Sequence, residues 1–521
     1  MVVKSKKIIV LLLIILAIAT FFRFWSLGSI PPGLYPDEAI NGNNAITSLE
    51  TGNYKLFYPE NNGREGLFIW FLSLSFKVLG VSIVALRVVP AVFGVLTVLG
   101  LYFLTKILLE KIDRNAKLIA LLSSFLLAVS FWHVNFSRIG FRAILVPFLL
   151  VFGFYFLNKA FIEKKWAFSA VSGIFLGLGF YTYISYRFVI FLFLLNVIVW
   201  WFFSKKEQFI KITAFCIIIT FIVALPLGIY FLKNPQDFFG RASGVSVFSQ
   251  ENPIYKLGKS LVFHLGMFNV YGDGNWRHNF AESPHLLWPV GILFLLGLIF
   301  SIKDLIIGLK NKNNHKIIAF SFLIGWFLFF LLPGVLSYEG IPHALRVIGV
   351  IPPVYIFSGI GGFWIINLIR KFFKSKKQII FFSVLIAIFF LTITYVQFFK
   401  YFYLWGKTEE TEGAFSKNYV KIGRYINTLP SDKNIYVVVN QSGVLVENIP
   451  MPAQTIQFIE KAEYGKTKAI YLLPDRLDEI KEENSVIIPM GKDNSLFLEL
   501  YNKFPKGNFQ KKDYFWVFNI E

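Results

Sequence analysis

The amino-acid sequence predicts a mainly α-helical, polytopic membrane helix bundle followed by a small C-terminal α/β domain. Of the 521 residues, 55% are hydrophobic and only 16% are charged, which is more apolar surface than a soluble core can bury. Apolar runs long enough to cross a bilayer recur as far as residue 400. Beyond that point, short apolar segments alternate with polar stretches of helical character.

About eleven segments have the length and hydropathy of membrane-spanning helices. They lie near residues 8–27, 85–105, 117–136, 143–161, 167–185, 188–204, 211–232, 286–302, 317–336, 347–369 and 378–399. Another apolar segment, 66–80, is short and contains Lys77, so we predict an interfacial or re-entrant helix, with a full span as the alternative. The predicted membrane module is 1–400, with outer loops at 28–65 and 233–284.

The distribution of positive charge predicts the orientation. The formal net charge is +21, and the lysines and arginines form short clusters between the apolar runs. If the N-terminus is cytoplasmic, the inner segments carry about twice as many cations as the outer loops, as the positive-inside rule requires. We therefore expect a multi-pass plasma-membrane protein with an extracytoplasmic C-terminal domain. Clusters of this kind anchor membrane helices, so nucleic-acid binding is not expected.

The N-terminal apolar run also resembles a secretory signal, with Ala17 and Ala19 in a small-x-small pattern. A retained first helix is the preferred interpretation, because the apolar run continues into FFRFW. Both interpretations place residues 28–65 outside.

The predicted soluble domain, residues 401–521, contains the strand-like segments IYVVVN, AIYLLP, SVIIPM and YFWVFNI. Stretches such as KNYVKIGRYINTL and DRLDEIKEE lie between them and have helical character. The domain has no glycine-rich phosphate loop, so a recognition or scaffolding role is favoured. The single cysteine, Cys216, excludes an intrachain disulfide and a cysteine-rich metal site.

The first outer loop contains the leading catalytic candidates, Asp37 and Glu38, directly after Pro36. Carboxylates in a first helical turn are stabilised by the helix dipole, so the pair could be purely structural. Its position at the membrane boundary, where a lower dielectric perturbs pKa values, favours a catalytic role. The same loop closes with three more charged residues, Glu60, Arg64 and Glu65.

The later outer loops repeat this combination of cations, histidines and carboxylates. By the predicted topology, every histidine except His315 faces outward. Ionisable groups at a membrane boundary are costly and indicate function. Together with Arg64 and Glu65, the candidate substrate- and phosphate-binding residues are Arg138, Arg142, Tyr183, Arg187, Asp273, Arg277, His278, His343 and Arg346. Arginines bind an anion and Asp37 supplies a base, which suits displacement of a phosphate by a hydroxyl. Each arginine could instead anchor its helix at the lipid headgroups.

No cofactor is expected to be required. A divalent metal is the alternative, with Asp273, His278 and His285 as possible ligands. No two of these residues have the tight H-x-x-x-H spacing of a helical metal site.

These residues are part of a wider resemblance. The chain has Asp37-Glu38-Ala39 in its first outer loop and Arg64-Glu65-Gly66-Leu67 at the end of that loop, followed by FKVLGVS and ALRVVPAVFG. The later segments GDGNWRHNF and GIPHALRVIGVIPP belong to the same pattern. Over roughly residues 8–370, the chain resembles the GT-C superfamily, specifically its protein O-mannosyltransferase and aminoarabinose transferase group. Many relatives have Pro-Pro or Pro-Leu near Glu65-Gly66-Leu67, so this element does not identify the sugar.

The resemblance implies a glycosyltransferase that moves a sugar from a polyprenyl-phosphate donor to an acceptor hydroxyl on the outer face, with inversion. It implies that Asp37 is the base. As a mechanistic hypothesis, Glu38 orients the acceptor or nearby cations. The acceptor could be a protein, a lipid or a cell-surface glycan. Two other classes stay open: a polytopic lipid or solute transporter, and a non-catalytic GT-C-like scaffold. The transporter is disfavoured because no internal repeat is visible, and the scaffold because Asp37 and Glu38 are both intact.

Overall fold

The computed structural model describes residues 5–203 and 206–520, and the chain divides into two compact units. The first unit comprises Met1–Trp25, Pro90–Arg138 and Arg142–Trp405. The second unit is assembled from three stretches that are far apart in sequence: Ser26–Val89, Ile139–Phe141 and Gly406–Glu521.

The membrane bundle is confirmed. Within residues 5–203 and 206–520, nine helices are long and apolar enough to cross a membrane. They are built around α1 (Ser5–Phe24), α4 (Ile83–Leu109), α7 (Leu145–Glu163), α9 (Val189–Phe203), α10 (Lys206–Lys233), α13 (Trp288–Lys310), α14 (Asn314–Val335), α15 (Ile351–Arg370) and α16 (Lys376–Phe399). The chain is therefore a multi-pass membrane protein.

Three further apolar helices are shorter: α3 (Leu67–Leu79), α5 (Ala116–Ala128) and α8 (Trp166–Gly179). The eleven predicted spans correspond to the nine long helices together with α5 and α8. The predicted span 117–136 is interrupted because the Ser130 hydroxyl accepts the backbone N–H of His133 and begins a new helix, α6 (Phe131–Phe136). Helix α3 is about 20 Å long at 1.5 Å per residue, which is too short to cross the hydrocarbon core.

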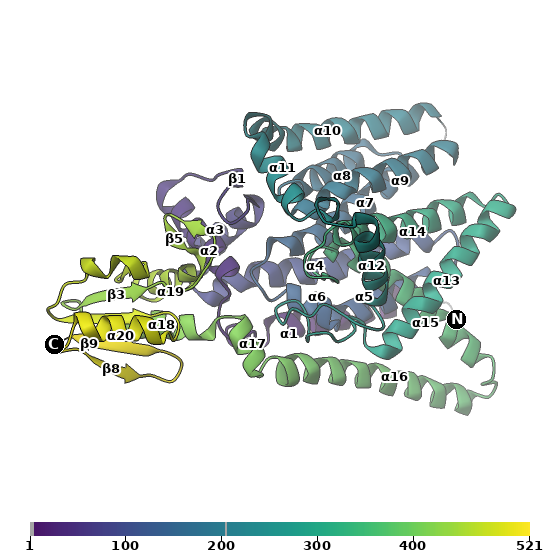
Figure 1. The fold of residues 1–521 in the computed structure, drawn as a ribbon. Coiled ribbons are helices and arrows are strands. Elements are labelled where there is room, and N and C mark those ends of the chain that lie inside the picture. The colour runs from purple at the N-terminus through teal and green to yellow at the C-terminus, as the bar shows by residue number, and fades with distance from the viewer. Residues whose placement is uncertain (1–4, 204–205, 521) are drawn as a thin grey trace. The chain divides into compact units, whose positions relative to one another are not determined.

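Helices α13 and α15 pack together at backbone contact (Figure 1). A Cβ atom on Gly297 would lie 1.7 Å from the carbonyl oxygen of Phe357, and one on Gly361 would lie 2.0 Å from that of Leu293. Small residues allow helices to approach in a bilayer, where van der Waals contact rather than the hydrophobic effect drives their association.

We expect Gly361→Val to destabilise the first unit by about 1–3 kcal/mol or more, because the added methyl groups meet backbone atoms that cannot turn aside. The measurement is the thermal unfolding midpoint of the purified protein in detergent. Gly228→Val is the matched control, since a Cβ at Gly228 in α10 has no neighbour within 4 Å. Equal midpoints for the two variants would contradict the close packing of α13 and α15.

The C-terminal part of the second unit is a five-stranded mixed sheet with helices on both faces (Figure 1). Its strand order is β6 (Ile470–Leu472), β3 (Asn434–Val438), β7 (Ser485–Pro489), β9 (Trp516–Ile520) and β8 (Asn508–Lys511). Strand β3 runs parallel to β6 and β7, whereas β9 is antiparallel to β7 and β8.

Side chains alternate across this sheet. Ile435 and Val437 face α18 (Lys417–Thr428) and α19 (Gln454–Tyr464), whereas Tyr436 and Val438 face α20 (Asn494–Lys503). The predicted α/β character of residues 401–521 is thus observed.

Helix α2 (Pro36–Thr51) packs against α19 within the second unit. The side-chain amide of Asn43 donates to the carbonyl and side-chain oxygens of Gln454 at 3.0 and 2.9 Å. The Thr455 hydroxyl donates to the carbonyl of Leu34 at 3.0 Å. The sequence predicts the first outer loop as part of the 1–400 module. In the structure, this loop belongs to the same compact unit as the C-terminal sheet.

Candidate active site

Glu38 and Arg87 form a fully buried ion pair at the start of α2. Both guanidinium contacts to the carboxylate, Nε to Oε2 and Nη2 to Oε1, measure 3.2 Å. The backbone N–H of Gly140 donates to Oε2 at 2.7 Å, and that of Tyr35 donates to Oε1 at 3.2 Å. Both carboxylate oxygens of Glu38 are therefore engaged inside the protein, which makes this residue a fixed support for the first turn of α2.

The Arg87 guanidinium also ties down the segment that leads into α2. It donates to the carbonyls of Pro31 and Gly33, each at 2.8 Å. Pro36 then occupies the first helical turn, where its missing N–H costs nothing. Arg87 and Pro36 thus fix the backbone of the segment that precedes Asp37.

Asp37 has a different environment from Glu38. Its side chain is only partly buried, and Oδ1 accepts a hydrogen bond of 2.8 Å from the side-chain amide of Asn61. Because successive residues of a helix point about 100° apart, one carboxylate turns into the core while its neighbour stays accessible. Asp37 is consequently the carboxylate of this pair that can meet a substrate.

Arg64 joins the short hairpin of β1 (Phe57–Tyr58) and β2 (Arg64–Glu65) to α2. Its two terminal nitrogens donate to the side-chain oxygens of Asn41 at 2.9 Å and Asn44 at 2.7 Å. Arg64 and Glu65 are both buried. The predicted binding role of these two residues stays a prediction, whereas the contribution of Arg64 to the position of α2 is observed.

The predicted cations of the first unit have varied surroundings. Arg142 is partly buried, and its guanidinium carbon lies 5.3 Å from the ring centre of Tyr183. Arg138 is fully buried and donates to the carbonyls of Phe22 and Trp25 at 2.9 and 2.7 Å. Since these carbonyls belong to the last turn of α1 and the residue after it, Arg138 stabilises the end of that helix.

The other predicted arginines contact their own loops and neighbouring helices. Arg187 lies over the ring of Phe238, 3.9 Å from its centre, and donates to its carbonyl at 2.9 Å. Arg346 pairs with Glu339 at 2.7 Å. The carbonyl of Arg277 accepts the side-chain amide of Asn135 at 2.7 Å.

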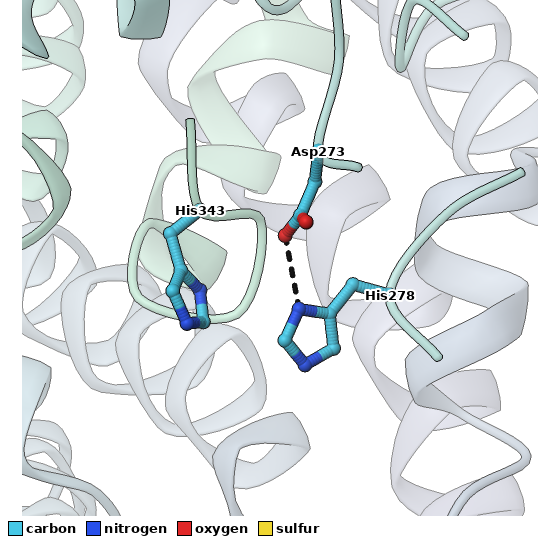
Figure 2. A group of neighbouring side chains, drawn as sticks. All are labelled: Asp273, His278 and His343. Carbon is cyan, nitrogen blue, oxygen red and sulfur yellow. Dashed lines mark hydrogen bonds and ion pairs between the residues drawn. The ribbon is translucent and has the colours of Figure 1, made fainter. Parts of the chain in front are cut away.

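A second polar group of the first unit contains Asp273, His278 and His343, and Figure 2 shows their side chains turned toward one another. His278 Nδ1 and Asp273 Oδ2 are 2.9 Å apart, and the same oxygen accepts the backbone N–H of Ala344 at 2.8 Å. The rings of His278 and His343 have centres 4.9 Å apart. The structure thus brings His343 together with Asp273 and His278, which the sequence analysis already groups as possible metal ligands.

Two more histidines hold the backbone of this group. His285 Nε2 accepts the N–H of Asp273 at 3.3 Å, and His264 Nε2 accepts the N–H of His343 at 3.1 Å. The sequence predicts His285 as a possible metal ligand, but the structure groups His343, not His285, with Asp273 and His278.

The charge states in this group follow from burial and contact. Burial lowers the pKa of His264 to about 4 and the pKa of His285 to about 3, so both rings are neutral and can accept hydrogen bonds. Burial alone would raise the pKa of Asp273, but His278, His343 and the N–H of Ala344 outweigh it and hold this pKa below its usual range.

Sequence reasoning assigns no role to Arg87, Asn61 or Arg23. Arg23 is fully buried in the last turn of α1, and its Nη2 lies 2.7 Å from Nδ1 of His133. The signal was present for both arginines, because a cation inside an apolar run is costly unless it has partners. Asn61 carries no comparable signal, since its contact with Asp37 depends on how the loop closes.

Comparisons with known proteins give one family match and several structural matches. The family model described as dolichyl-phosphate-mannose-protein mannosyltransferase matches residues 67–230. No curated protein matches the chain. Among solved structures, ArnT from Cupriavidus metallidurans, bound to undecaprenyl phosphate, has a TM-score of 0.56 and 11% identity, with 99% of this chain and 98% of that chain covered.

Archaeal oligosaccharyltransferases are also similar in fold. The apo enzyme from Archaeoglobus fulgidus has a TM-score of 0.56 and 13% identity, covering 88% of this chain and 64% of that chain. AglB from the same organism, in complex with an inhibitory peptide and a dolichol-phosphate, has a TM-score of 0.54 and 13% identity, covering 99% and 74%. The chain therefore has the GT-C fold that its sequence predicts.

Proposed function

We propose that this GT-C protein is a membrane glycosyltransferase that moves a sugar from a polyprenyl-phosphate donor to an acceptor hydroxyl on the outer face of the membrane. The observation that carries the proposal is the contrast at the start of α2, where an accessible Asp37 follows a helix entrance held by the buried Glu38–Arg87 pair. The mannosyltransferase match at 67–230 supports the donor class, as do similar structures that contain undecaprenyl phosphate or dolichol-phosphate.

Asp37 acts as the general base. Its carboxylate takes the proton of the acceptor hydroxyl while the hydroxyl oxygen forms a bond to the anomeric carbon of the sugar. The bond between that carbon and the phosphate oxygen breaks on the opposite side, so the configuration inverts and the polyprenyl phosphate leaves with the electron pair. Proton transfer to a positioned base contributes about 10²–10⁴ in rate.

Glu38 is a positioning residue in this proposal. Its carboxylate is committed to Arg87 and to two backbone N–H groups, so it acts by fixing the direction in which Asp37 projects. Displacing a catalytic group by about 1 Å can cost 10²-fold in rate.

The donor phosphate needs cations that balance its growing charge. Arg142, Arg187, Arg277 and Arg346 are the partly exposed arginines of the predicted set within the described chain, and we assign this role to them first. Arg138 and Arg64 are buried and support α1 and α2, which gives them structural roles.

The enzyme is tested by incubating membranes that contain the full chain with a panel of radiolabelled polyprenyl-phosphate sugars. We expect the label of one sugar to move into a protein, lipid or glycan fraction, which would identify both substrates. Label that stays on every donor in the panel would contradict the proposed activity.

The orientation is tested with single cysteines in a chain that carries Cys216→Ser, because Cys216 is buried. We expect Asn53→Cys, on the exposed first outer loop, to react with a membrane-impermeant maleimide in intact cells. Lys165→Cys, exposed between α7 and α8, should react only after the membrane is opened. The reverse pattern would place Asp37 in the cytosol and exclude an outer-face reaction.

A further inference from the structure

Two loops of the first unit meet at Asp273, His278 and His343. The first two residues lie between α12 (Pro253–Gly266) and α13, and the third lies between α14 and α15. One possible ligand atom from each residue lies within 4.8 Å of the others. Asp273 and His278 are buried, and His343 is partly buried.

The carboxylate of Asp273 is already oriented. Oδ1 accepts the backbone N–H of Asn275 at 2.8 Å, while Oδ2 accepts that of Ala344 at 2.8 Å and faces His278 Nδ1 at 2.9 Å. Because Ala344 lies in the second loop, its hydrogen bond to Asp273 joins the two loops. Asp273 is thus fixed beside both imidazoles.

His343 provides an independent observation that points to a ligand. Its Nδ1 atom is buried and has no hydrogen-bond partner among the residues that the structure describes. A buried polar atom of this kind destabilises the fold unless something binds it. The contact between Asp273 and His278 lies within one loop, so it does not account for the third side chain, His343, which comes from the other loop.

We propose that Asp273, His278 and His343 bind a divalent transition-metal ion of the zinc class that fastens the two loops together. Two imidazoles and one carboxylate are donors that zinc accepts, whereas magnesium and calcium require a shell of oxygen atoms. The ion replaces the Nδ1 proton of His278, and that proton moves to Nε2. Three protein ligands leave one coordination position open to water or to an anionic oxygen.

His264 and His285 support the proposed ligands from behind. Each accepts the backbone N–H of a ligand residue at its Nε2 atom, and His264 Nδ1 lies 2.8 Å from the carbonyl of Ser260, to which it donates. Groups that orient ligands in this way typically contribute about 10–100-fold to metal affinity. The site goes beyond the proposed transfer reaction and does not depend on it.

The test is zinc binding by the full chain, purified in detergent, stripped with a chelator and equilibrated with zinc chloride. Elemental mass spectrometry should find about one zinc per chain, as a single set of three protein ligands predicts. Asp273→Asn, His278→Ala and His343→Ala should each reduce zinc affinity at least tenfold, and His285→Ala should weaken binding without abolishing it. His315→Ala, an exposed histidine outside the site, is the matched control and should bind as the unaltered chain does.

Cobalt substitution provides a readout that misfolding cannot imitate. The unaltered chain loaded with Co²⁺ should show intense visible d–d absorption typical of a low-coordinate site, and His343→Gln, chosen to keep the loop filled, should lose it. Equal zinc content in the unaltered chain and the three ligand variants would overturn the proposal. So would zinc uptake that His315→Ala reduces as much as His278→Ala does.

Discussion

Asp37→Asn is expected to slow sugar transfer about 10²–10⁴-fold while the protein still folds and binds its donor. Asparagine has nearly the same shape as aspartate and can still accept the hydrogen bond from Asn61, but it cannot take a proton from the acceptor. The measurement is the initial rate of label transfer under saturating donor, together with the thermal unfolding midpoint.

Glu50→Gln is the matched control for Asp37→Asn. Glu50 is an exposed carboxylate on the same helix, so this variant removes the same charge from α2 without touching its first turn. Its transfer rate should equal that of the unaltered chain. If Asp37→Asn turns over at a near-normal rate, Asp37 is not the base and the proposed mechanism fails.

Glu38→Ala is expected to destabilise the second unit by about 3–5 kcal/mol, because it leaves the buried guanidinium of Arg87 without a counter-charge. The N–H of Gly140 loses its acceptor at the same time. Amide hydrogen exchange should increase through α2 and its lead-in segment, and the transfer rate should fall because Asp37 is no longer held. Glu38→Gln, which keeps an acceptor for Gly140, should recover part of both losses.

A double variant and a surface pair provide the controls. Glu38→Leu combined with Arg87→Met removes both charges and should be less destabilising than Glu38→Ala alone. The exposed Lys55 and the partly buried Glu60 form an ion pair at 3.8 Å in the same unit, so Lys55→Met should change stability by less than about 1 kcal/mol. If Glu38→Ala is no more damaging than Lys55→Met, the buried pair does not organise α2.

Hydropathy predicts the helices of this chain well, because a bilayer requires about 20 apolar residues in a row and the sequence shows them directly. Alternation predicts strands such as β3 equally well. Strand β8 was missed because NFQK is polar, and it pairs with β9 at the sheet edge. The stretch DRLDEIKEE forms only a short 3₁₀ helix, Pro474–Glu479, which shows that a favourable composition does not by itself make a helix continue.

The candidate site was harder to predict because its contacts depend on tertiary structure. Asp37 and Glu38 are adjacent in the sequence. Their environments differ only because Arg87 and Gly140 contact Glu38 in the folded chain. Asp273 and His278 are close in sequence, but two membrane helices, α13 and α14, separate them from His343. No rule based on ligand spacing in the sequence would group His343 with the other two residues. The sequence predicts Arg138 and Arg64 as anion-binding residues. In the structure, Arg138 donates to backbone carbonyls and Arg64 to asparagine side chains, and neither kind of acceptor can be recognised from the sequence.

The second unit joins the first outer loop to the last part of the chain, and this connection constrains when the protein matures. Helix α2 is synthesised early, whereas α19, to which Asn43 and Leu34 are hydrogen-bonded, is synthesised only after the last membrane helix. The proposed base, Asp37, is therefore set in place at the end of biosynthesis. A ribosome-bound or prematurely terminated chain, however well inserted, lacks the α19 partner of α2, and we expect it to remain inactive toward the sugar donors of its membrane.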